Sequence, residues 1–255
     1  MKGSNNFLAL KNKTYLVTGV TSGIGKDICL TLLKEGAKVI GIARDETKIK
    51  EIIDVYSPTF FRFYSFDLEE INEIESLINK SVETFGKLDG CILCAGKEET
   101  VPLSVYKPEK LLHLFNINVF SGIEILRLFS KKKNSNDASS VIFFSSVMAE
   151  LGQPGKVGYC ASKAAITGVV KASALELAKR KIRVNAILPG VIDTPMTNKL
   201  FGNLNDENIN EIIKKHPLGI GKAEDVTSMA MFLLSNKSSW LTGQNIKIDG
   251  GYSIS

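Results

Sequence analysis

The chain has 255 residues, of which 44% are hydrophobic and 23% are charged, and its formal net charge is +5. These values are typical of a globular protein that buries a substantial core without disulfide staples. The mild charge gives no reason to expect a nucleic acid or a membrane as a partner. The apolar run at residues 7–10 is too short for a signal peptide, and no segment approaches the ~18 apolar residues of a membrane span. We therefore expect a cytoplasmic protein.

The first predicted element is a short apolar strand over residues 15–18 that stops at a glycine turn. Thr18-Gly19-Val20-Thr21-Ser22-Gly23-Ile24-Gly25 leads into a helix, because Ile24, Ile28 and Leu32 recur at helical spacing. In such a turn the glycines permit a tight reversal, approach of the backbone to a pyrophosphate, and packing of helix on strand. The first amides of the helix then face the anion. Glycine turns also precede helices that bind no ligand, so this turn alone does not establish a nucleotide site.

Apolar segments of strand length alternate with helical patterns along the rest of the chain, and no linker interrupts them. We expect one domain over residues 1–255, with strands at 15–18, 38–43, 61–66, 90–95, 140–145, 183–188 and 245–248. Residues 39–43 and 141–144 are almost continuously apolar, which is typical of parallel strands buried on both faces. The predicted fold is a doubly wound α/β (Rossmann) sandwich, a seven-stranded parallel sheet with helices on both faces.

Ligands in this architecture bind beyond the carboxyl ends of the strands. Asp67, after the third strand, also has a purely structural interpretation, because Asp67-Leu68-Glu69-Glu70 has the spacing of a capping box at a helix N-terminus. Residues suited to a site follow six predicted strands: Gly19, Ala43-Arg44, Asp67, Ala95-Gly96, Ser145-Ser146 and Pro189-Gly190.

Three further segments have both a structural and a functional interpretation. Cys91-Ile92-Leu93-Cys94 is a CxxC, but in an apolar strand its two thiols point to opposite faces, which favours buried structural cysteines and no metal. Lys131-Lys132-Lys133 indicates a solvated helix end, and the alternative is a contact with an acidic acyl carrier protein or a phosphate-bearing substrate. Residues 197–216 form either a lid over substrate or a surface helical excursion.

Ser146, Tyr159 and Lys163 form the second chemical motif. Tyr159 and Lys163 are one helical turn apart, so both leave the same face and can converge on one ligand, although that spacing also occurs on many solvated helices. A free phenol has a pKa of about 10, and we expect Lys163 and an oxidised nicotinamide to lower it, which makes Tyr159 an acid–base catalyst. Ser146 and Tyr159 would stabilise the charge that develops on a carbonyl oxygen.

At these motifs the sequence resembles the short-chain dehydrogenase/reductase family over nearly its whole length. Further matches lie at residues 116–119, 185–194 and 241–251. The resemblance implies that Asn118 is a fourth catalytic residue, at a helix distortion, that relays protons between Lys163 and solvent through a water. Its structural alternative is a polar residue that only bonds backbone. The implied cofactor contacts are Gly19, Thr21, Ser22, Gly23, Ile24, Gly25, Arg44, Asp67, Leu68, Ala95, Gly96, Tyr159, Lys163, Pro189, Gly190, Ile192 and Thr194.

The end of the second strand indicates which nicotinamide cofactor binds. An acidic residue there would chelate the ribose hydroxyls of NAD, whereas Ala43 followed by Arg44 suits the 2′-phosphate of NADP. NADP is therefore favoured over NAD, although Ser22 stands where many NADP-preferring relatives carry a second basic group. One departure from the family is Leu93-Cys94-Ala95-Gly96, where Asn-Asn-Ala-Gly is usual. We expect the missing amides to affect the sheet more than the chemistry.

The chain is therefore predicted to be an NADP-dependent oxidoreductase that transfers hydride between nicotinamide and a ketone or secondary alcohol. Among relatives it most resembles the 3-oxoacyl-acyl-carrier-protein reductases, and reductases of sugars, steroids or secondary metabolites share its features. A catalytically silent NADP-binding regulator is the alternative outside the enzymes. Epimerases and dehydratases of the wider family are disfavoured because they carry a longer C-terminal substrate domain. A homotetramer, or a homodimer, is implied because relatives pair the helix after Tyr159, which is rich in small residues: Ala161, Ala164, Ala165, Gly168, Ala172 and Ala174.

Overall fold

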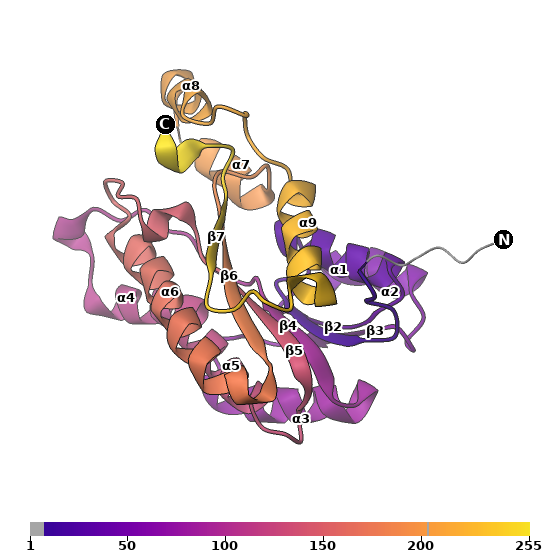
Figure 1. The fold of residues 1–255 in the computed structure, drawn as a ribbon. Helices are drawn as coiled ribbons and strands as arrows, with labels where there is room; N and C mark the ends of the chain where they lie inside the picture. Colours follow the sequence, from indigo (N-terminus) through magenta and orange to yellow (C-terminus); the bar gives the residue numbers. More distant parts are fainter. Residues whose placement is uncertain (1–7, 203) are drawn as a thin grey trace.

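The computed structural model describes residues 8–202 and 204–255, and its centre is a seven-stranded sheet (Figure 1). Every pair of neighbouring strands is parallel, in the order β3-β2-β1-β4-β5-β6-β7. This confirms the doubly wound parallel architecture predicted from the apolar runs. The strands are β1 Thr14–Thr18, β2 Lys38–Ala43, β3 Phe61–Ser65, β4 Leu88–Leu93, β5 Ser135–Phe144, β6 Arg183–Pro189 and β7 Asn245–Ile248.

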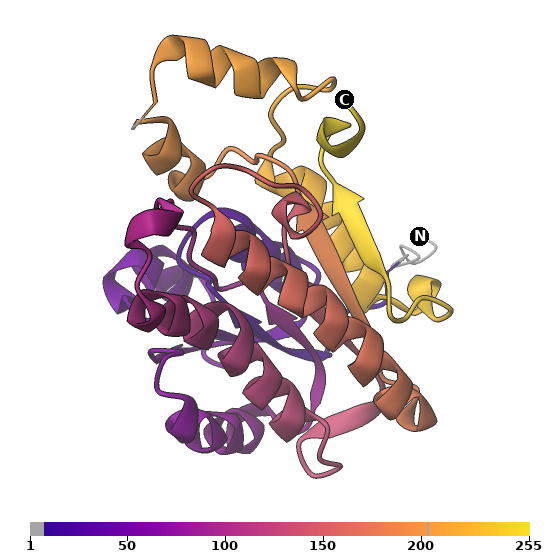
Figure 2. The same cartoon turned by 90° about the vertical axis from the view of Figure 1, so that its left-hand side faces the viewer.

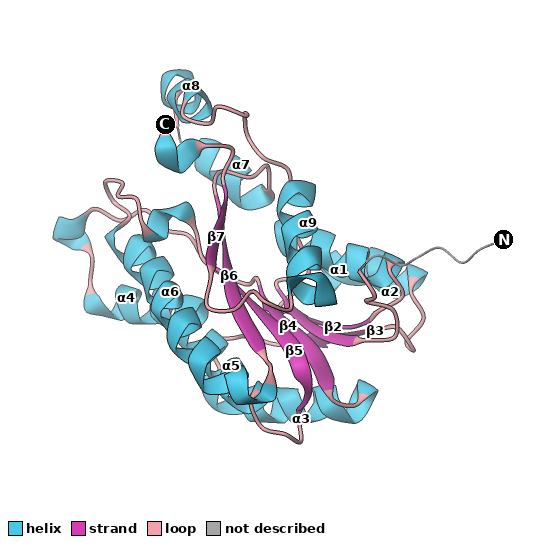
Figure 3. Ribbon diagram, viewed as in Figure 1, coloured by secondary structure: helices cyan, strands magenta, loops and turns pink. Residues whose placement is uncertain are grey.

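Helices cover both faces of the sheet (Figures 1 and 3). Apolar side chains of α3, α5 and α6 pack with one face in a single core cluster, and those of α1, α2 and α9 pack with the other face in a second cluster. Strands buried on both sides need apolar residues at successive positions, which is why the strand sequences do not alternate. The helices are α1 Gly23–Lys34, α2 Lys50–Val55, α3 Ile74–Phe85, α4 Pro108–Phe115, α5 Ser121–Phe129, α6 Val157–Leu177, α7 Pro195–Phe201, α8 Asp206–Lys214 and α9 Ala223–Leu234.

The strand order places a crevice between β1 and β4. The chain winds from β1 outward to β2 and β3, then crosses back so that β4 pairs with the other side of β1. Such a reversal separates the loops that follow β1 and β4, and it leaves room for a ligand at their carboxyl ends. The glycine turn follows β1 and Ala95-Gly96 follows β4, so both predicted motifs border this crevice.

Strand β5 begins five residues earlier than predicted. Ser135 pairs with Leu88, and the register then jumps so that Ser140 pairs with Gly90. The intervening residues bulge out of the ladder, and Ala138 adopts a left-handed φ of 59°. The polar residues of this bulge conceal the strand start from a reading based on apolar runs.

Helices α4 and α5 are joined by a π-helical segment, Asn116–Phe120, into one helix from Pro108 to Phe129. This 22-residue helix has a mean hydropathy of 1.3, so by length and composition it meets the test for a membrane span, contrary to the expectation that no segment does. Its inner face explains the hydropathy, because Leu114, Ile125 and Phe129 are fully buried and the last two pack in the core against the sheet. It is the core helix of an α/β sandwich.

Candidate active site

The glycine turn after β1 leaves the backbone open to a ligand. Gly19 has a φ of +78° and Gly23 a φ of +54°, values that favour glycine. A Cβ at Gly25 would lie 2.4 Å from the carbonyl oxygen of Gly19, so only glycine allows α1 to start this close to β1. Ser22 gives no side-chain cap and the first turn of α1 has no acidic residue. The free amides of this turn therefore fit the pyrophosphate of a dinucleotide.

Four catalytic candidates from three elements meet at the carboxyl edge of β4 and β5. Ser146 follows β5, and Tyr159 and Lys163 project from the same face of α6, with Nζ of Lys163 5.8 Å from the centroid of the Tyr159 ring. A Cβ at Gly96 would lie 3.3 Å from Nζ of Lys163 and 3.4 Å from Oδ1 of Asn118. Both polar atoms therefore face the space beside Gly96.

Asn118 lies in the π-helical segment, so the helix distortion implied by the family resemblance is present. Its side chain accepts from the backbone nitrogen of Lys97 at 2.8 Å, donates to the carbonyl oxygen of Lys97 at 2.9 Å, and donates to Oγ of Ser162 at 3.0 Å. Ser162 in turn donates to the carbonyl oxygen of Tyr159 at 2.8 Å. Asn118 thus fixes the loop after β4 and contacts the helix that carries the catalytic candidates.

Burial governs the ionisation of Tyr159 and Lys163. It raises the pKa of Tyr159, with an interaction with Ser146 acting in the opposite direction. It lowers the pKa of Lys163 to about 8. The predicted lowering of the Tyr159 pKa also involves an oxidised nicotinamide, so it stays a prediction for the protein with bound cofactor. The Lys163 amine donates to the carbonyl oxygen of Phe144 at 2.9 Å.

Two adjoining cavities connect the glycine turn to these residues. The larger, of about 680 Å³, extends from the glycine turn past β2 to the loop after β4. The smaller, of about 130 Å³, has Ser146, Tyr159 and Lys163 in its wall. Every predicted cofactor residue lines one or both: Gly19, Thr21, Ser22, Gly23, Ile24, Gly25, Arg44, Asp67, Leu68, Ala95, Gly96, Tyr159, Lys163, Pro189, Gly190, Ile192 and Thr194.

At the far end of the larger cleft, Arg44 and Asp67 face each other. Nη1 of Arg44 lies 3.8 Å from Oδ2 of Asp67, and 71% of the Arg44 side chain is exposed, so the guanidinium has freedom to meet a phosphate. The capping-box interpretation of Asp67 is wrong. Its carboxylate accepts from the backbone nitrogen of Glu69 in a tight turn, and α3 begins only at Ile74. The turn satisfies the local amides before any helix starts.

The departure after β4 has a local remedy. The hydroxyl of Thr18 accepts from the backbone nitrogen of Ala95 at 3.0 Å and ties β1 to the loop after β4. Cys91 and Cys94 pack in the cores on opposite faces of the sheet, as predicted, and burial raises the pKa of both thiols. Within residues 8–202 and 204–255 no cluster of metal-binding side chains is found.

The segment at 197–216 consists mainly of helices, which is compatible with both a lid over substrate and a surface helical excursion. Met196 and Thr197 of α7 line the smaller cavity, whereas α8 has no buried residue and lies away from the sheet (Figure 2). His216 anchors the segment's end: Nε2 accepts from the backbone nitrogen of Val191 at 3.2 Å, and the ring stacks on Tyr252 with centroids 4.4 Å apart. The excursion is therefore fastened to the loop that follows β6.

Sequence reasoning missed a charged group beside Tyr159. Lys156, immediately before α6, contacts the carboxylate of Glu98 from the loop after β4, and only 3% of Lys156 is exposed. Its position three residues before Tyr159 was a visible signal, since that spacing puts two side chains on one face. Its partner is 58 residues away in sequence and was not visible.

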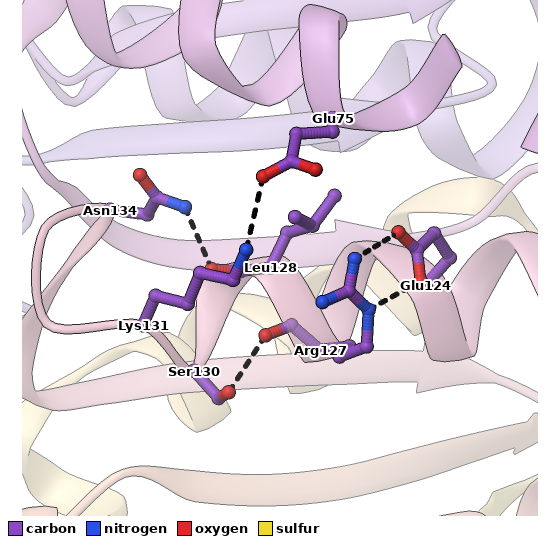
Figure 4. A network of polar contacts seen from close by, with 7 residues as sticks. All are labelled: Glu75, Glu124, Arg127, Leu128, Ser130, Lys131 and Asn134. Atoms are coloured by element: carbon purple, nitrogen blue, oxygen red, sulfur yellow. Dashed lines mark hydrogen bonds and ion pairs between the residues drawn. The ribbon is translucent and has the colours of Figure 1, made fainter. Parts of the chain in front are cut away.

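The lysine run at 131–133 lies at the other end of the sheet. It follows α5 and precedes the start of β5, whereas Ser146 follows the end of β5, so the full strand separates the two. Nζ of Lys131 contacts Oε1 of Glu75 at 3.0 Å, next to the pair of Arg127 and Glu124 (Figure 4). This supports a solvated helix end and places the run far from the cavities.

Comparisons with known proteins agree with this geometry. A family model described as "Enoyl-(Acyl carrier protein) reductase" matches residues 19–253. The 3-oxoacyl-[acyl-carrier-protein] reductase FabG of Thermotoga maritima is 35% identical over 252 residues, which is 97% of this chain and 100% of the relative. A 3alpha-hydroxysteroid dehydrogenase of Mediterraneibacter gnavus is 30% identical over 249 residues, or 96% of this chain and 98% of the relative.

Solved structures give the same result. A short-chain dehydrogenase/reductase from Brucella melitensis superposes with a TM-score of 0.89 at 26% identity, over 96% of this chain and 98% of that one. The aldohexose dehydrogenase of Thermoplasma acidophilum superposes with a TM-score of 0.84 at 26% identity, over 97% of this chain and 96% of that one. The chain therefore belongs to the short-chain dehydrogenase/reductase family of nicotinamide-dependent oxidoreductases.

Proposed function

We propose that this enzyme reduces a ketone with NADPH, most readily a 3-oxoacyl thioester, and catalyses the reverse oxidation with NADP. The observation that carries this proposal is the arrangement at the smaller cavity. A buried phenol, a buried amine and a hydroxyl line a space that adjoins the dinucleotide-sized cleft. A carbonyl carbon in that space would lie beside the phenol and next to the cleft that would hold the nicotinamide.

The residues have separate roles in reduction. Tyr159 gives its phenolic proton to the carbonyl oxygen as the carbonyl carbon receives hydride, and the hydroxyl of Ser146 donates a hydrogen bond to the same oxygen. Lys163 returns a proton toward the resulting phenolate, and its ammonium form stabilises that anion. Asn118 holds the loop beside Lys163 and serves the relay to solvent. A nicotinamide nucleotide, when bound, supplies or accepts the hydride.

Residues of the cleft and of the smaller cavity would hold the successive parts of the cofactor. The amides after Gly19 would bind the pyrophosphate, and Asp67 and Leu68 would contact the adenine. Arg44 would pair with the 2′-phosphate, which would give the preference for NADP. Ala95 and Gly96 would admit the ribose. The carboxamide and pyrophosphate side would be contacted by Pro189, Gly190, Ile192 and Thr194. Thr194 suits this role because it packs on the glycine turn: a Cβ at Gly23 would lie 3.0 Å from Cγ2 of Thr194.

A second substrate class is favoured by the relatives. The steroid dehydrogenase and the aldohexose dehydrogenase named above match over nearly the whole chain, as the 3-oxoacyl reductase does. A small ketone of the steroid or sugar type is therefore the alternative substrate. The segment at 197–216 would act as the lid that selects between them.

The test is a substrate panel. Purified protein is mixed with NADPH or NADH and an acetoacetyl thioester, a ketosugar, a cyclic ketone or a steroid ketone, and loss of nicotinamide absorbance is followed. Fastest turnover of the thioester with NADPH supports the proposal. Fastest turnover of a steroid or sugar shifts the substrate class. Tight NADPH binding without turnover of any ketone contradicts the enzyme and favours a silent regulator.

We also propose that the chain is one catalytic domain, works in the cytoplasm and assembles as a homotetramer. The outer face of the helix from Pro108 to Phe129 exposes Leu112, Phe120 and Ile123. The neighbouring α6 (front of Figure 2) exposes the small residues Ala161 and Ala172. An apolar face next to small side chains permits close helix packing between two copies. Light scattering coupled to size-exclusion chromatography tests the assembly, and a monomer would contradict it.

A further inference from the structure

We propose that Lys156 is a positioning residue that, paired with Glu98, holds a second positive charge beside Tyr159 and tunes its proton transfer. This rests on the proposed function, in which Tyr159 is the acid–base group. Lys156 itself touches no reacting atom and acts through the tyrosine.

The geometry places two amines around one phenol. Nζ of Lys156 lies 6.0 Å from the centroid of the Tyr159 ring, and Nζ of Lys163 lies 5.8 Å from the same centroid. Lys163 belongs to the expected catalytic set, whereas Lys156 has an equal distance and no assigned role. A cation close to a phenol favours the phenolate, and a carboxylate paired with that cation reduces the effect.

Contacts on both sides hold the pair in place. Lys156 contacts the carboxylate of Glu98, which also accepts from Oγ1 of Thr100 at 3.3 Å. The neighbouring backbone is tied across the two loops, since the nitrogen of Val101 donates to the carbonyl oxygen of Gly155 at 2.8 Å. Glu98 also lines the cofactor cleft. The pair therefore connects the cleft wall to the start of the catalytic helix.

Burial makes the partner necessary. Lys156 is 3% exposed, and burial lowers its pKa, so an unpaired amine at this position would readily lose its proton. The carboxylate of Glu98 in direct contact favours the ammonium. The other groups that act on Tyr159 are Lys163 and Cys160 on its own helix and Ser146 after β5. Glu99 pairs with Lys97 and binds the hydroxyl of Tyr106, so its charge is already engaged.

Each substitution is expected to move the Tyr159 pKa in a definite direction. Lys156→Met removes the cation and leaves an anion near the phenol, so both changes raise the Tyr159 pKa. Lys156→Met with Glu98→Gln removes both charges, so the Tyr159 pKa rises less than in the single variant, because the anion that raises it is removed as well. Lys156→Arg keeps the charge and leaves the pKa near that of the wild type. We expect a rise of about one unit for the single variant.

The experiment measures the Tyr159 pKa of the wild type and of each variant in two ways. The first is the pH dependence of kcat/KM for alcohol oxidation, whose limb is assigned to Tyr159 by loss of turnover in Tyr159→Phe. The second is the carbon NMR signal of the Tyr159 Cζ in protein with labelled tyrosine, assigned by its absence from Tyr159→Phe. Lys171→Met, at an exposed position on α6, is the matched control and should shift neither.

The proposal is overturned if Lys156→Met leaves the Tyr159 titration at the wild-type position, or if the double variant shifts it as far as the single one. If Lys156→Met does not fold, the double variant decides: a titration above wild type supports the proposal, and coincidence with wild type overturns it. Absence of turnover in the wild type would count against the proposed function instead, and the NMR titration would still decide the role of Lys156.

Discussion

The two ends of the sheet place charges in opposite environments. At the carboxyl end, Lys156 and Lys163 are 3% and 5% exposed and lie beside one buried phenol. At the amino end, Lys131, Glu75, Arg127 and Glu124 form ion pairs whose side chains are 21% to 52% exposed. Buried charges change the pKa values of their neighbours, whereas exposed pairs are screened by water. Chemistry should therefore depend on the first end and hardly at all on the second.

The largest expected effect is that of Tyr159→Phe, which removes the proton donor and keeps the ring. We expect kcat to fall about 10²–10⁴-fold while NADPH still binds. Stopped assays of turnover and a fluorescence titration with NADPH measure the two quantities. Tyr64→Phe, which removes a hydroxyl that contacts Thr84 on α3, is the control and should leave turnover unchanged. Equal activity of Tyr159→Phe and Tyr64→Phe would contradict the view that the chemistry depends on the carboxyl end of the sheet.

Gly25→Ala should weaken cofactor binding by distorting the turn. The added methyl group would lie 2.4 Å from the carbonyl oxygen of Gly19, far inside van der Waals contact. We expect NADPH to bind the variant at least ten-fold more weakly than the wild type, a loss of about 1.4 kcal/mol in binding free energy. NADPH should therefore raise the melting temperature of the variant less than that of the wild type. Gly168→Ala on α6 adds the same methyl group where no atom lies within 4 Å, and it should bind NADPH normally. Equal binding by both variants would rule out the turn as the pyrophosphate site.

Lys163 should make stability rise with pH. Burial lowers its pKa from the ordinary 10.5 to about 8 in the folded chain, so between these values the unfolded chain holds a proton that the folded chain has released. The free energy of unfolding of the cofactor-free protein therefore increases across this window, by roughly 3 kcal/mol. Urea unfolding near both limits measures it, and Lys163→Met should show a smaller increase. Parallel behaviour of the two proteins would refute the shift.

Arg44→Glu should change the choice of cofactor. A charged hydrogen bond to the 2′-phosphate contributes about 1.5–3 kcal/mol, so we expect the preference for NADPH over NADH to fall roughly 10- to 100-fold. The ratio of kcat/KM for the two cofactors is the measurement. Arg62→Glu makes the same change at an exposed position on β3 and should leave the ratio alone. An unchanged ratio in Arg44→Glu would remove this residue from the 2′-phosphate site.

The smallest effect is expected at the amino end of the sheet. Lys131→Glu breaks the exposed pair with Glu75, and we expect little change in melting temperature because water screens such pairs. Turnover of a carrier-linked thioester and of a small thioester should be equally unaffected, since β5 separates this end from Ser146. A loss confined to the carrier-linked substrate would restore the lysine run at 131–133 as a docking site.

Much of the fold was readable from the sequence because burial leaves local traces. Continuous apolar runs identified the buried parallel strands, and the turn around Gly19, Gly23 and Gly25 identified the crevice beside β1. The start of β5 was missed because Ser135 joins the sheet by pairing with Leu88. The polar residues around Ser135 give no local sign of this pairing. Register of this kind is a tertiary property.

The site was predictable in its members and less so in its electrostatics. Ser146, Tyr159 and Lys163 converge as their spacing indicates. The sequence predicts that Lys163 and an oxidised nicotinamide lower the Tyr159 pKa, and it gave no sign of the burial that raises this pKa in the protein without cofactor. The contact between Lys156 and Glu98 joins two loops that only the strand order brings together. The spacing of residues within one helix predicts neither the burial of Tyr159 nor this contact between two loops.

The π turn at Asn116–Phe120 sets the rotational phase of everything that follows it in the helix. It inserts one residue relative to a regular helix, and one residue corresponds to about 100° of rotation. If the same residues were wound as an uninterrupted α-helix, Ile125 and Phe129 would be rotated by about 100°, away from the sheet. The same insertion that places Asn118 beside Lys97 therefore also keeps the second half of the helix in phase with its core. The site and the packing share one helical irregularity, so neither can be altered there without the other.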